Sequence, residues 1–286
     1  MGQRTLKKFI TTHEIKKNAW QTSEVASAYY GLINNQTNFQ TLITELLVEG
    51  VDKLDGIHHD AQILDLGAGT GAITLALLRM GFQVDAIDIS SSMLNHINIQ
   101  GYESKVRLFV QDFFDLDKFV GGPYDLCVSR WVLGHFANWP DVIARLRRIM
   151  KPGGYLRFDL LSEETFELSR AKEGFDPSTF AFDDRVNSAP PELFYASADI
   201  KRLRKIAEFA GYSVTEVRPL SFFYDNPRLH CPELGGSHFK TYRSLLEACF
   251  QSPGGLDLLR YFESCITPNL DHNMVGSLRV TMRADS

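Results

Sequence analysis

Three glycines at alternate positions, Gly67, Gly69 and Gly71, follow an apolar segment that contains Asp65. Glycine has no Cβ, so it permits backbone angles and close approaches that other residues forbid, and a ligand can lie against the main chain. Residues 73–78 then carry apolar side chains at helical spacing. This spacing predicts a buried strand, a tight turn and a helix N-terminus that together bind a small ligand.

Acidic residues at the ends of the expected strands indicate the class of that ligand. Asp65 precedes the glycines, where it would repel a diphosphate but attract the sulfonium and ammonium groups of S-adenosylmethionine. Asp88 ends the second strand and is placed to accept hydrogen bonds from two ribose hydroxyls. Asp112 follows the third strand and can accept the amino proton of an adenine, with the Phe113 backbone as a neighbouring donor.

A second ligand class uses a similar turn. Gly67, Gly69 and Ala72 satisfy the glycine pattern of dinucleotide-binding proteins, and Asp88 would suit an NAD ribose equally well. An NAD(P)-dependent oxidoreductase is therefore the alternative interpretation.

Short apolar segments alternate with amphipathic ones from residue 62 onward. Strands are expected at 62–66, 83–88, 105–110, 124–129, 154–160, 212–218 and 275–282. Helices are expected within 22–56 and at 71–80, 91–100, 140–150, 199–210, 238–250 and 255–264. This alternation predicts an α/β fold with a doubly wound, mostly parallel sheet whose ligand lies at the carboxyl ends of the strands.

The chain resembles the class I, seven-stranded, Rossmann-like S-adenosylmethionine-dependent methyltransferases. Five segments carry the resemblance in the expected order: 64–71, 88–90, 111–113, 124–126 and 146–154. The resemblance implies that the glycine turn contacts the methionine part of the cofactor, Asp88 the ribose, and the segment after the fourth strand the amino-acid end. The expected cofactor residues are Asp65, Gly67, Gly69, Gly71, Asp88, Ile89, Met93, Asp112, Phe113, Ser129 and Arg130.

The long segments around this core predict a cap and a lid. We expect an N-terminal helical cap at 1–58, a methyltransferase core at 59–161 and 199–286, and substrate-side insertions at 162–198 and 219–274. Insertions of that size are usually functional lids. Aromatic residues of the cap and of the second insertion are weaker substrate-contact candidates: Trp20, Tyr29, Tyr30, Phe222 and Phe223.

Two residues could deprotonate a methyl acceptor. His135 follows the fourth strand and Asp159 ends the fifth, so both should lie over the same crevice. The Trp131–His135 segment is also similar to one in protein α-N-terminal methyltransferases, in which a histidine here and an aspartate after the next strand assist amine deprotonation. We therefore expect methyl transfer to nitrogen or oxygen of a small molecule or short peptide-like metabolite. A non-catalytic S-adenosylmethionine-binding module and an aminopropyl-type transferase are the remaining rivals.

Composition bounds the partners. The 286 residues carry a formal net charge of -5, which argues against a nucleic-acid partner. Neither a signal peptide nor a membrane-spanning segment is visible, so a cytoplasmic location is expected. The histidines of the second insertion (His230, His238 and His272) lack metal-ligand spacing, and no metal site is expected.

Overall fold

The computed structural model describes residues 17–18, 20–35, 37–136, 138–162, 200–223 and 239–286. Its centre is a seven-stranded sheet in the order β3-β2-β1-β4-β5-β7-β6. The strands are β1 (Gln62–Leu66), β2 (Gln83–Asp88), β3 (Val106–Val110), β4 (Tyr124–Ser129), β5 (Met150–Leu161), β6 (Tyr212–Ser221) and β7 (Ser277–Ala284). The pairs among β1 to β5 are parallel, while β7 runs antiparallel to both β5 and β6. The predicted doubly wound, mostly parallel sheet is confirmed.

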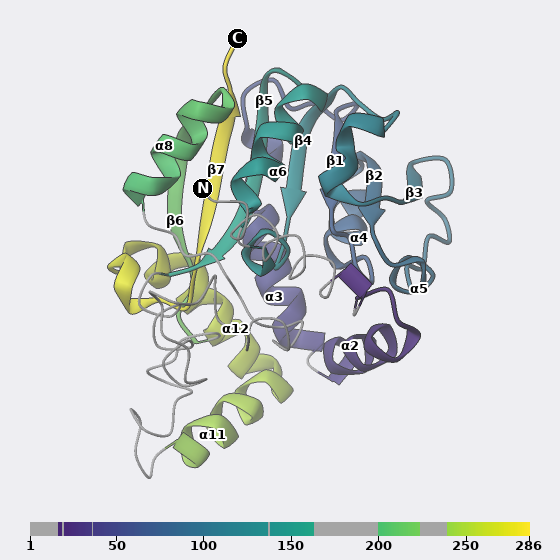
Figure 1. Cartoon of the computed structure of the whole chain (residues 1–286). Coiled ribbons are helices and arrows are strands. Elements are labelled where there is room, and N and C mark those ends of the chain that lie inside the picture. The colour runs from purple at the N-terminus through teal and green to yellow at the C-terminus, as the bar shows by residue number, and fades with distance from the viewer. Residues whose placement is uncertain (1–16, 19, 36, 137, 163–199, 224–238) are drawn as a thin grey trace, which may run out of the picture.

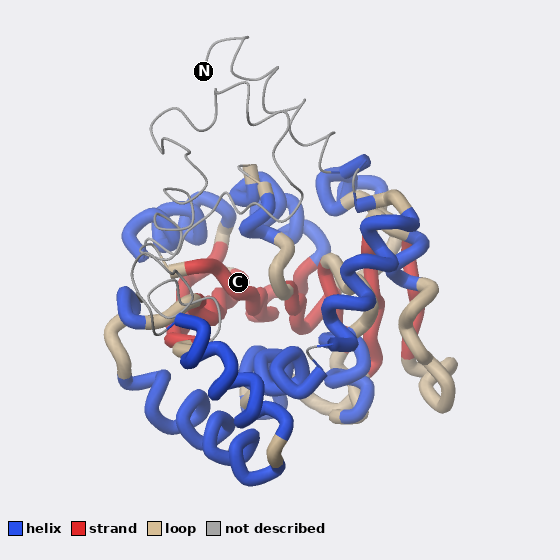
Figure 2. The backbone as a smooth tube through the Cα atoms, turned by 90° about the horizontal axis from the view of Figure 1, so that it is seen from below, coloured by secondary structure: helices blue, strands red, loops and turns tan. Residues whose placement is uncertain are grey.

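Helices cover both faces of the sheet (Figures 1 and 2). One layer holds α3 (Thr37–Val48), α4 (Ala72–Arg79) and the short α5 (Ser91–Leu94), and the other holds α6 (Trp139–Leu146) and α8 (Ile200–Ala210). Each layer packs its apolar side against the sheet, so the strands between them are almost wholly buried. Buried parallel strands hold the strand ends, and therefore the candidate site, in a fixed arrangement.

The remaining helices lie toward the carboxyl ends of the parallel strands. They are α2 (Ser23–Asn35), which contacts α5, and the pair α11 (Phe239–Gln251) and α12 (Pro253–Tyr261), which lies below the sheet in Figure 1. A π-helix, Phe262–Ile266, continues α12. The expected second insertion is thus largely helical in its described part, whereas the first, apart from Ser162, lies outside the described residues.

One helix prediction was wrong. The sequence pattern predicted a helix at 91–100, but α5 ends at Leu94. The segment that follows contains Asn95 and Asn98, and the Asn98 side chain accepts a hydrogen bond from the Gln100 amide at 3.2 Å. Asparagine forms such local bonds at the expense of the helical ones, which accounts for the early end.

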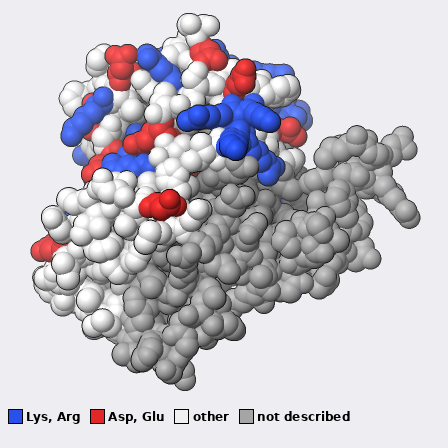
Figure 3. Space-filling view, turned by 90° about the vertical axis from the view of Figure 1, so that its left-hand side faces the viewer, with Lys and Arg blue, Asp and Glu red and all other residues white. Residues whose placement is uncertain are grey.

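The outer face of α8 is strongly basic. Lys201, Arg202, Arg204 and Lys205 are all exposed, and Lys and Arg side chains gather on that side of the molecule (Figure 3). The inner face carries the buried Leu203, so this helix has one apolar and one charged side.

Candidate functional site

The glycine turn lies between β1 and α4, next to the junction of β1 and β4 where the strand order reverses. Gly67, Gly69 and Gly71 have φ angles of 73°, 53° and 88°. A Cβ on Gly67 would lie 2.3 Å from a methyl carbon of Val132, and one on Gly71 would lie 2.7 Å from Ile97. Both positions therefore require glycine for conformation and for space.

The amide groups of this turn are used within the protein. Those of Gly67 and Ala68 donate to the Ile87 carbonyl at 2.8 and 2.9 Å, and that of Gly71 donates to the Ala68 carbonyl at 2.8 Å. The Gly69 amide donates to Asp88 Oδ2 at 2.8 Å. A diphosphate at a glycine turn depends on such donors, and here they already have acceptors. The oxidoreductase interpretation thus lacks its physical basis.

Asp65 anchors the helix that follows the turn. Its side chain is 1% exposed and accepts hydrogen bonds from the hydroxyl of Thr74, at 2.5 Å, and from the Thr74 amide in the first turn of α4. Burial raises the pKa of the Asp65 carboxyl to about 7. Because Gly71 at the N-cap has no side chain, Asp65 satisfies donors at this helix end.

Asp88 closes the other side of the turn. Besides the Gly69 amide, its carboxylate accepts the Ser90 amide at 2.9 Å, and burial raises its pKa. Ile89 follows it and is partly buried, whereas Met93, one turn into α5, is 2% exposed. Asp88 and Ile89 are therefore partly accessible at the end of β2, whereas Met93 belongs to the buried core.

Asp112 and Phe113 follow β3 as predicted. Asp112 Oδ1 accepts the Phe114 amide at 2.9 Å, and its Oδ2 forms an ion pair with Lys17 Nζ at 3.0 Å. The Phe113 ring is buried against Phe136, with 5.1 Å between ring centroids. The adenine end of the expected site is therefore bounded by residues from two distant parts of the sequence.

The end of β4 is tied to the layer of helices. Ser129 Oγ donates to the Leu66 carbonyl at 3.0 Å, which fixes β4 against β1. Arg130 donates to Thr44 Oγ1 of α3 at 2.6 Å, and its guanidinium lies 4.5 Å from the centroid of the Trp131 ring. Ser129 is thus structural in its observed contacts, and Arg130 is the cation nearest the strand junction.

The side chain of Asp159, near the end of β5, is buried beside an unusual backbone turn at Trp131. Trp131 has φ of 54°, rare for a residue with a Cβ, and its amide donates to Asp159 Oδ1 at 2.7 Å. Asp159 is 4% exposed, and its Oδ2 has no hydrogen-bond partner within the described part of the chain. Burial raises the pKa of this carboxyl to about 6. A buried oxygen with spare acceptor capacity is a candidate contact for a ligand donor.

His135 lies on a 3-10 turn (Leu133–His135) that packs against β5, the strand of Asp159. Its ring is 7% exposed and meets the edge of Trp20, with centroids 5.7 Å apart. Trp20 also contacts Tyr29 at 5.7 Å, and a Cβ on Gly69 would lie 3.9 Å from the Tyr29 ring. The predicted base and two cap aromatics are therefore gathered above the glycine turn.

Tyr29 lies close to three charged residues of the candidate site. Burial raises the pKa of its hydroxyl; Arg130 acts against this shift, and Asp88 and Asp159 add to it. Tyr29 thus lies within electrostatic reach of the ends of β2, β4 and β5. Tyr30 faces away and stacks on His96 with centroids 4.1 Å apart.

Phe222 and Phe223 are not part of this cluster. They follow β6, which β5 and β7 separate from β4, and their rings pack on each other and on Phe262. Both amides donate to the buried carboxylate of Glu263, at 2.9 to 3.1 Å. Their observed role is to join the π-helix to the end of β6.

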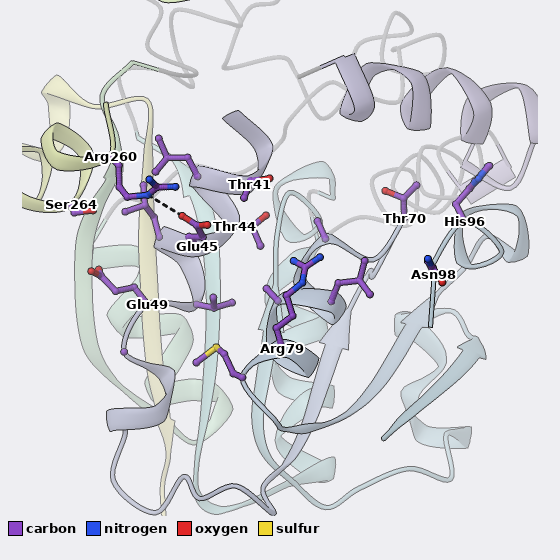
Figure 4. Close-up of a pocket in the computed structure, with 18 of the residues that line it drawn as sticks. Thr41, Thr44, Glu45, Glu49, Thr70, Arg79, His96, Asn98, Arg260 and Ser264 are labelled. Atoms are coloured by element: carbon purple, nitrogen blue, oxygen red, sulfur yellow. Dashed lines mark hydrogen bonds and ion pairs between the residues drawn. The ribbon is translucent and has the colours of Figure 1, made fainter. Parts of the chain in front are cut away.

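A pocket of about 650 Å³ opens on the outer side of α3 and α4 (Figure 4). Its lining includes Tyr30 of the cap, Thr70 of the glycine turn, and Arg260, whose guanidinium pairs with Glu45 at 3.3 Å. Arg79 projects into the pocket between α3 and α4. Sequence periodicity did not reveal this pocket, because it depends on how two helices and α12 pack together.

The described residues show no helix long and apolar enough to cross a membrane. Within the same residues, no group of histidine, cysteine and acidic side chains could hold a metal ion. The candidate site comprises the glycine turn, the acidic residues Asp88, Asp112 and Asp159, and the basic residues Arg130 and Lys17, while Asp65 lies buried at the start of α4. An excess of acidic groups suits a cationic nucleoside better than a diphosphate.

Comparison with known proteins agrees with this geometry. Residues 64–158 match the family model described as a methyltransferase domain. The chain is 30% identical over 120 residues to the ubiquinone biosynthesis O-methyltransferase of Colwellia psychrerythraea, a match that covers 41% of this chain and 48% of that protein. It is 29% identical over 154 residues to the malonyl-[acyl-carrier protein] O-methyltransferase of Halalkalibacterium halodurans, covering 50% and 54%. The chain thus spans about half the length of these curated relatives.

The fold matches solved structures over nearly the whole chain. The plantazolicin methyltransferase, solved in complex with a triazolic desmethylPZN analogue and S-adenosylhomocysteine, aligns with 99% of this chain and 98% of its own, with a TM-score of 0.59 and 12% identity. At that identity the match concerns the fold alone. Residues 64–158 therefore form a methyltransferase domain within a Rossmann-like fold. This domain match, together with neighbours solved with bound S-adenosylhomocysteine, supports S-adenosylmethionine as the cofactor.

Proposed function

We propose that this protein transfers the methyl group of S-adenosylmethionine to an oxygen or nitrogen of a small molecule or short peptide-like metabolite. The observation that carries the proposal is the buried Asp159 Oδ2, which has spare acceptor capacity among the described residues at the strand ends beside the glycine turn. Relatives named O-methyltransferases favour oxygen as the acceptor atom.

The cofactor supplies an activated methyl group on a sulfonium, so the protein has to align the acceptor and remove its proton. The expected holding residues are the glycine turn, Asp88 and Asp112, with the cap aromatics above them. Asp65 supports this arrangement from below by fixing the start of α4. Alignment of two reactants accounts for up to roughly 7–11 kcal/mol in favourable cases.

Asp159 and His135 are the proposed proton acceptors. As the acceptor's lone pair forms the new bond to the methyl carbon, the carbon–sulfur bond breaks and its electrons stay on sulfur. The proton released by the acceptor passes to Asp159 Oδ2 or to His135. A carboxyl with a pKa of about 6 is mostly ionised at pH 7 and is still a better base than an ordinary aspartate.

The first test is ligand binding followed by turnover. Isothermal titration should show binding of S-adenosylhomocysteine and none of NADH; the opposite result would refute the proposal. Purified protein is then incubated with S-adenosylmethionine and panels of phenols, carboxylic acids and amines, and S-adenosylhomocysteine formation is measured. Cofactor binding without turnover on any panel would instead support the non-catalytic binding module.

A further inference from the structure

Residues 17–18 and 20–30, here called the cap segment, contact several elements of the candidate cofactor site. Lys17 pairs with Asp112 after β3, and Gln21 donates to the Ile89 carbonyl after β2 at 3.4 Å. Trp20 meets His135 after β4, and Tyr29 lies over Gly69. Cofactor bound at the strand ends would therefore lie beneath this segment, between it and the sheet.

The Lys17–Asp112 ion pair joins the cap segment to the loop that follows β3. The two side chains are 26% and 11% exposed, so water screens the pair only partly. Asp112 is held from two sides, because Oδ1 accepts the Phe114 amide of its own loop while Oδ2 pairs with the cap.

We infer that Lys17 is a positioning residue of the cofactor site: through its ion pair with Asp112 it holds the cap segment closed over the bound nucleoside. The inference rests on the assignment of Asp112 to the adenine end in the proposed function. Breaking the pair is then a step in cofactor release. Removal of Lys17 should speed dissociation and leave association almost unchanged.

Removal of Lys17 could also have the opposite effect on cofactor binding, which makes the inference testable. If the ammonium group of Lys17 competed with the adenine amino group for Asp112, removing it would tighten cofactor binding. The positions of Trp20, Gln21 and Tyr29 argue for closure, since they contact other parts of the site at the same time. A partly buried pair of this kind corresponds to about a threefold to tenfold change in rate.

The experiment measures binding kinetics of S-adenosylhomocysteine to the full chain by stopped-flow tryptophan fluorescence. Lys17→Met should raise the dissociation rate about threefold to tenfold, with the association rate within about twofold of wild type. Lys17→Arg should restore slow dissociation. Lys118→Met is the matched control, because it removes another lysine–aspartate pair (Lys118–Asp115, 3.5 Å) from the loop that follows Asp112.

Salt dependence and a double-mutant cycle distinguish loss of the Lys17–Asp112 ion pair from a general effect of substituting Lys17. Raising salt from 50 to 500 mM should speed dissociation from wild type more than from Lys17→Met, because the variant lacks the pair. In an Asp112→Asn background, Lys17→Met should raise the dissociation rate by a smaller factor than it does in wild type. Unchanged or slower dissociation in Lys17→Met would overturn the inference. Failure of wild type to bind the ligand at all would instead refute the proposed function.

Discussion

Asp159 is expected to affect both the stability and the activity of the protein, and substitution of this residue tests each effect. Its burial raises the pKa to about 6, so the folded state holds a proton that the unfolded state releases above about pH 4. Stability from this group is complete below pH 4 and is lost as the pH rises to about 6. Asp159→Asn should therefore stabilise the protein at pH 8 by about 2–3 kcal/mol relative to its effect at pH 4, as measured by urea unfolding.

The same substitution should lower activity. Loss of a general base typically costs about 10²–10⁴-fold, and the kcat/KM of wild type should rise with pH through about 6 as Asp159 ionises. A variant that is both more stable at pH 8 and nearly inactive would match the proposed role. An Asp159→Asn variant of wild-type activity would remove Asp159 from the mechanism, whatever its stability.

Gly69 offers a second test at the residue scale. Its φ is 53°, and among the described residues a Cβ there would meet the Tyr29 ring alone, at 3.9 Å. Gly81 has φ of 96°, has no described atom within 4 Å of such a Cβ, and precedes the amino end of β2, so Gly81→Ala is a matched control for backbone strain. Both alanine variants should lose about 1–2 kcal/mol of stability. Only Gly69→Ala should weaken S-adenosylhomocysteine binding, by tenfold or more in calorimetry; equal binding by both would contradict the role of Gly69 as a cofactor contact.

The candidate site residues could be named from the sequence, but the residues that contact them could not. Glycines in series and acids at strand ends are local features, and the structure gathers Asp65, Asp88 and Asp159 around one turn. The contacts of Lys17 with Asp112 and of Trp20 with His135 join residues about a hundred positions apart. No periodicity encodes such pairs, so the cap could be predicted as a helix but not as a cover of specific residues.

At the scale of elements, strands were easier to predict than helices. A strand such as β1, which is almost wholly buried, is mostly apolar, and its predicted bounds agree with the observed Gln62–Leu66. α5 is different, because the segment after Leu94 forms local bonds such as that from the Gln100 amide to the Asn98 side chain. The positive φ of Trp131 was not predicted, since tryptophan has no preference for that conformation.

Two buried arginines fix α3 on the sheet, which leads to a prediction for an element. Arg279 donates to the Leu46 carbonyl at 2.6 Å and Arg157 to the Glu49 carbonyl at 2.8 Å, at the C-terminal end of α3. Arg279→Met would leave the Leu46 carbonyl without this buried donor and would remove the arginine that pairs with Glu216 at 2.9 Å, so we expect a loss of about 3–5 kcal/mol in denaturant unfolding.

The control for this substitution lies on the same strand. Arg283 is 44% exposed and pairs with the exposed Asp55 at 3.0 Å, so Arg283→Met should cost at most about 1 kcal/mol. Similar losses in both variants would show that the burial of Arg279 does not decide its contribution.

For the whole molecule, the sheet separates two regions. The glycine turn and most of the candidate acidic residues follow β1, β2 and β3. Phe222 and Phe223 follow β6, near the opposite edge, where they contact the helices of the second insertion. Glu263 of the π-helix links the insertion to the end of β6. It is 2% exposed and also accepts a hydrogen bond from the Thr267 hydroxyl at 2.6 Å. A disturbance here should reach the insertion without reaching the cofactor.

Glu263→Ala tests this separation. The substitution removes the carboxylate that accepts from the Phe222 and Phe223 amides, which should cost about 2–3 kcal/mol in unfolding. Glu263→Gln retains one acceptor oxygen and should cost less. The affinity for S-adenosylhomocysteine should stay within about twofold of wild type in both variants, because β5 and β7 stand between β6 and β4. If calorimetry showed cofactor affinity falling in step with the loss of stability, the two edges of the sheet would be coupled, and the insertion would have to be treated as part of the cofactor site.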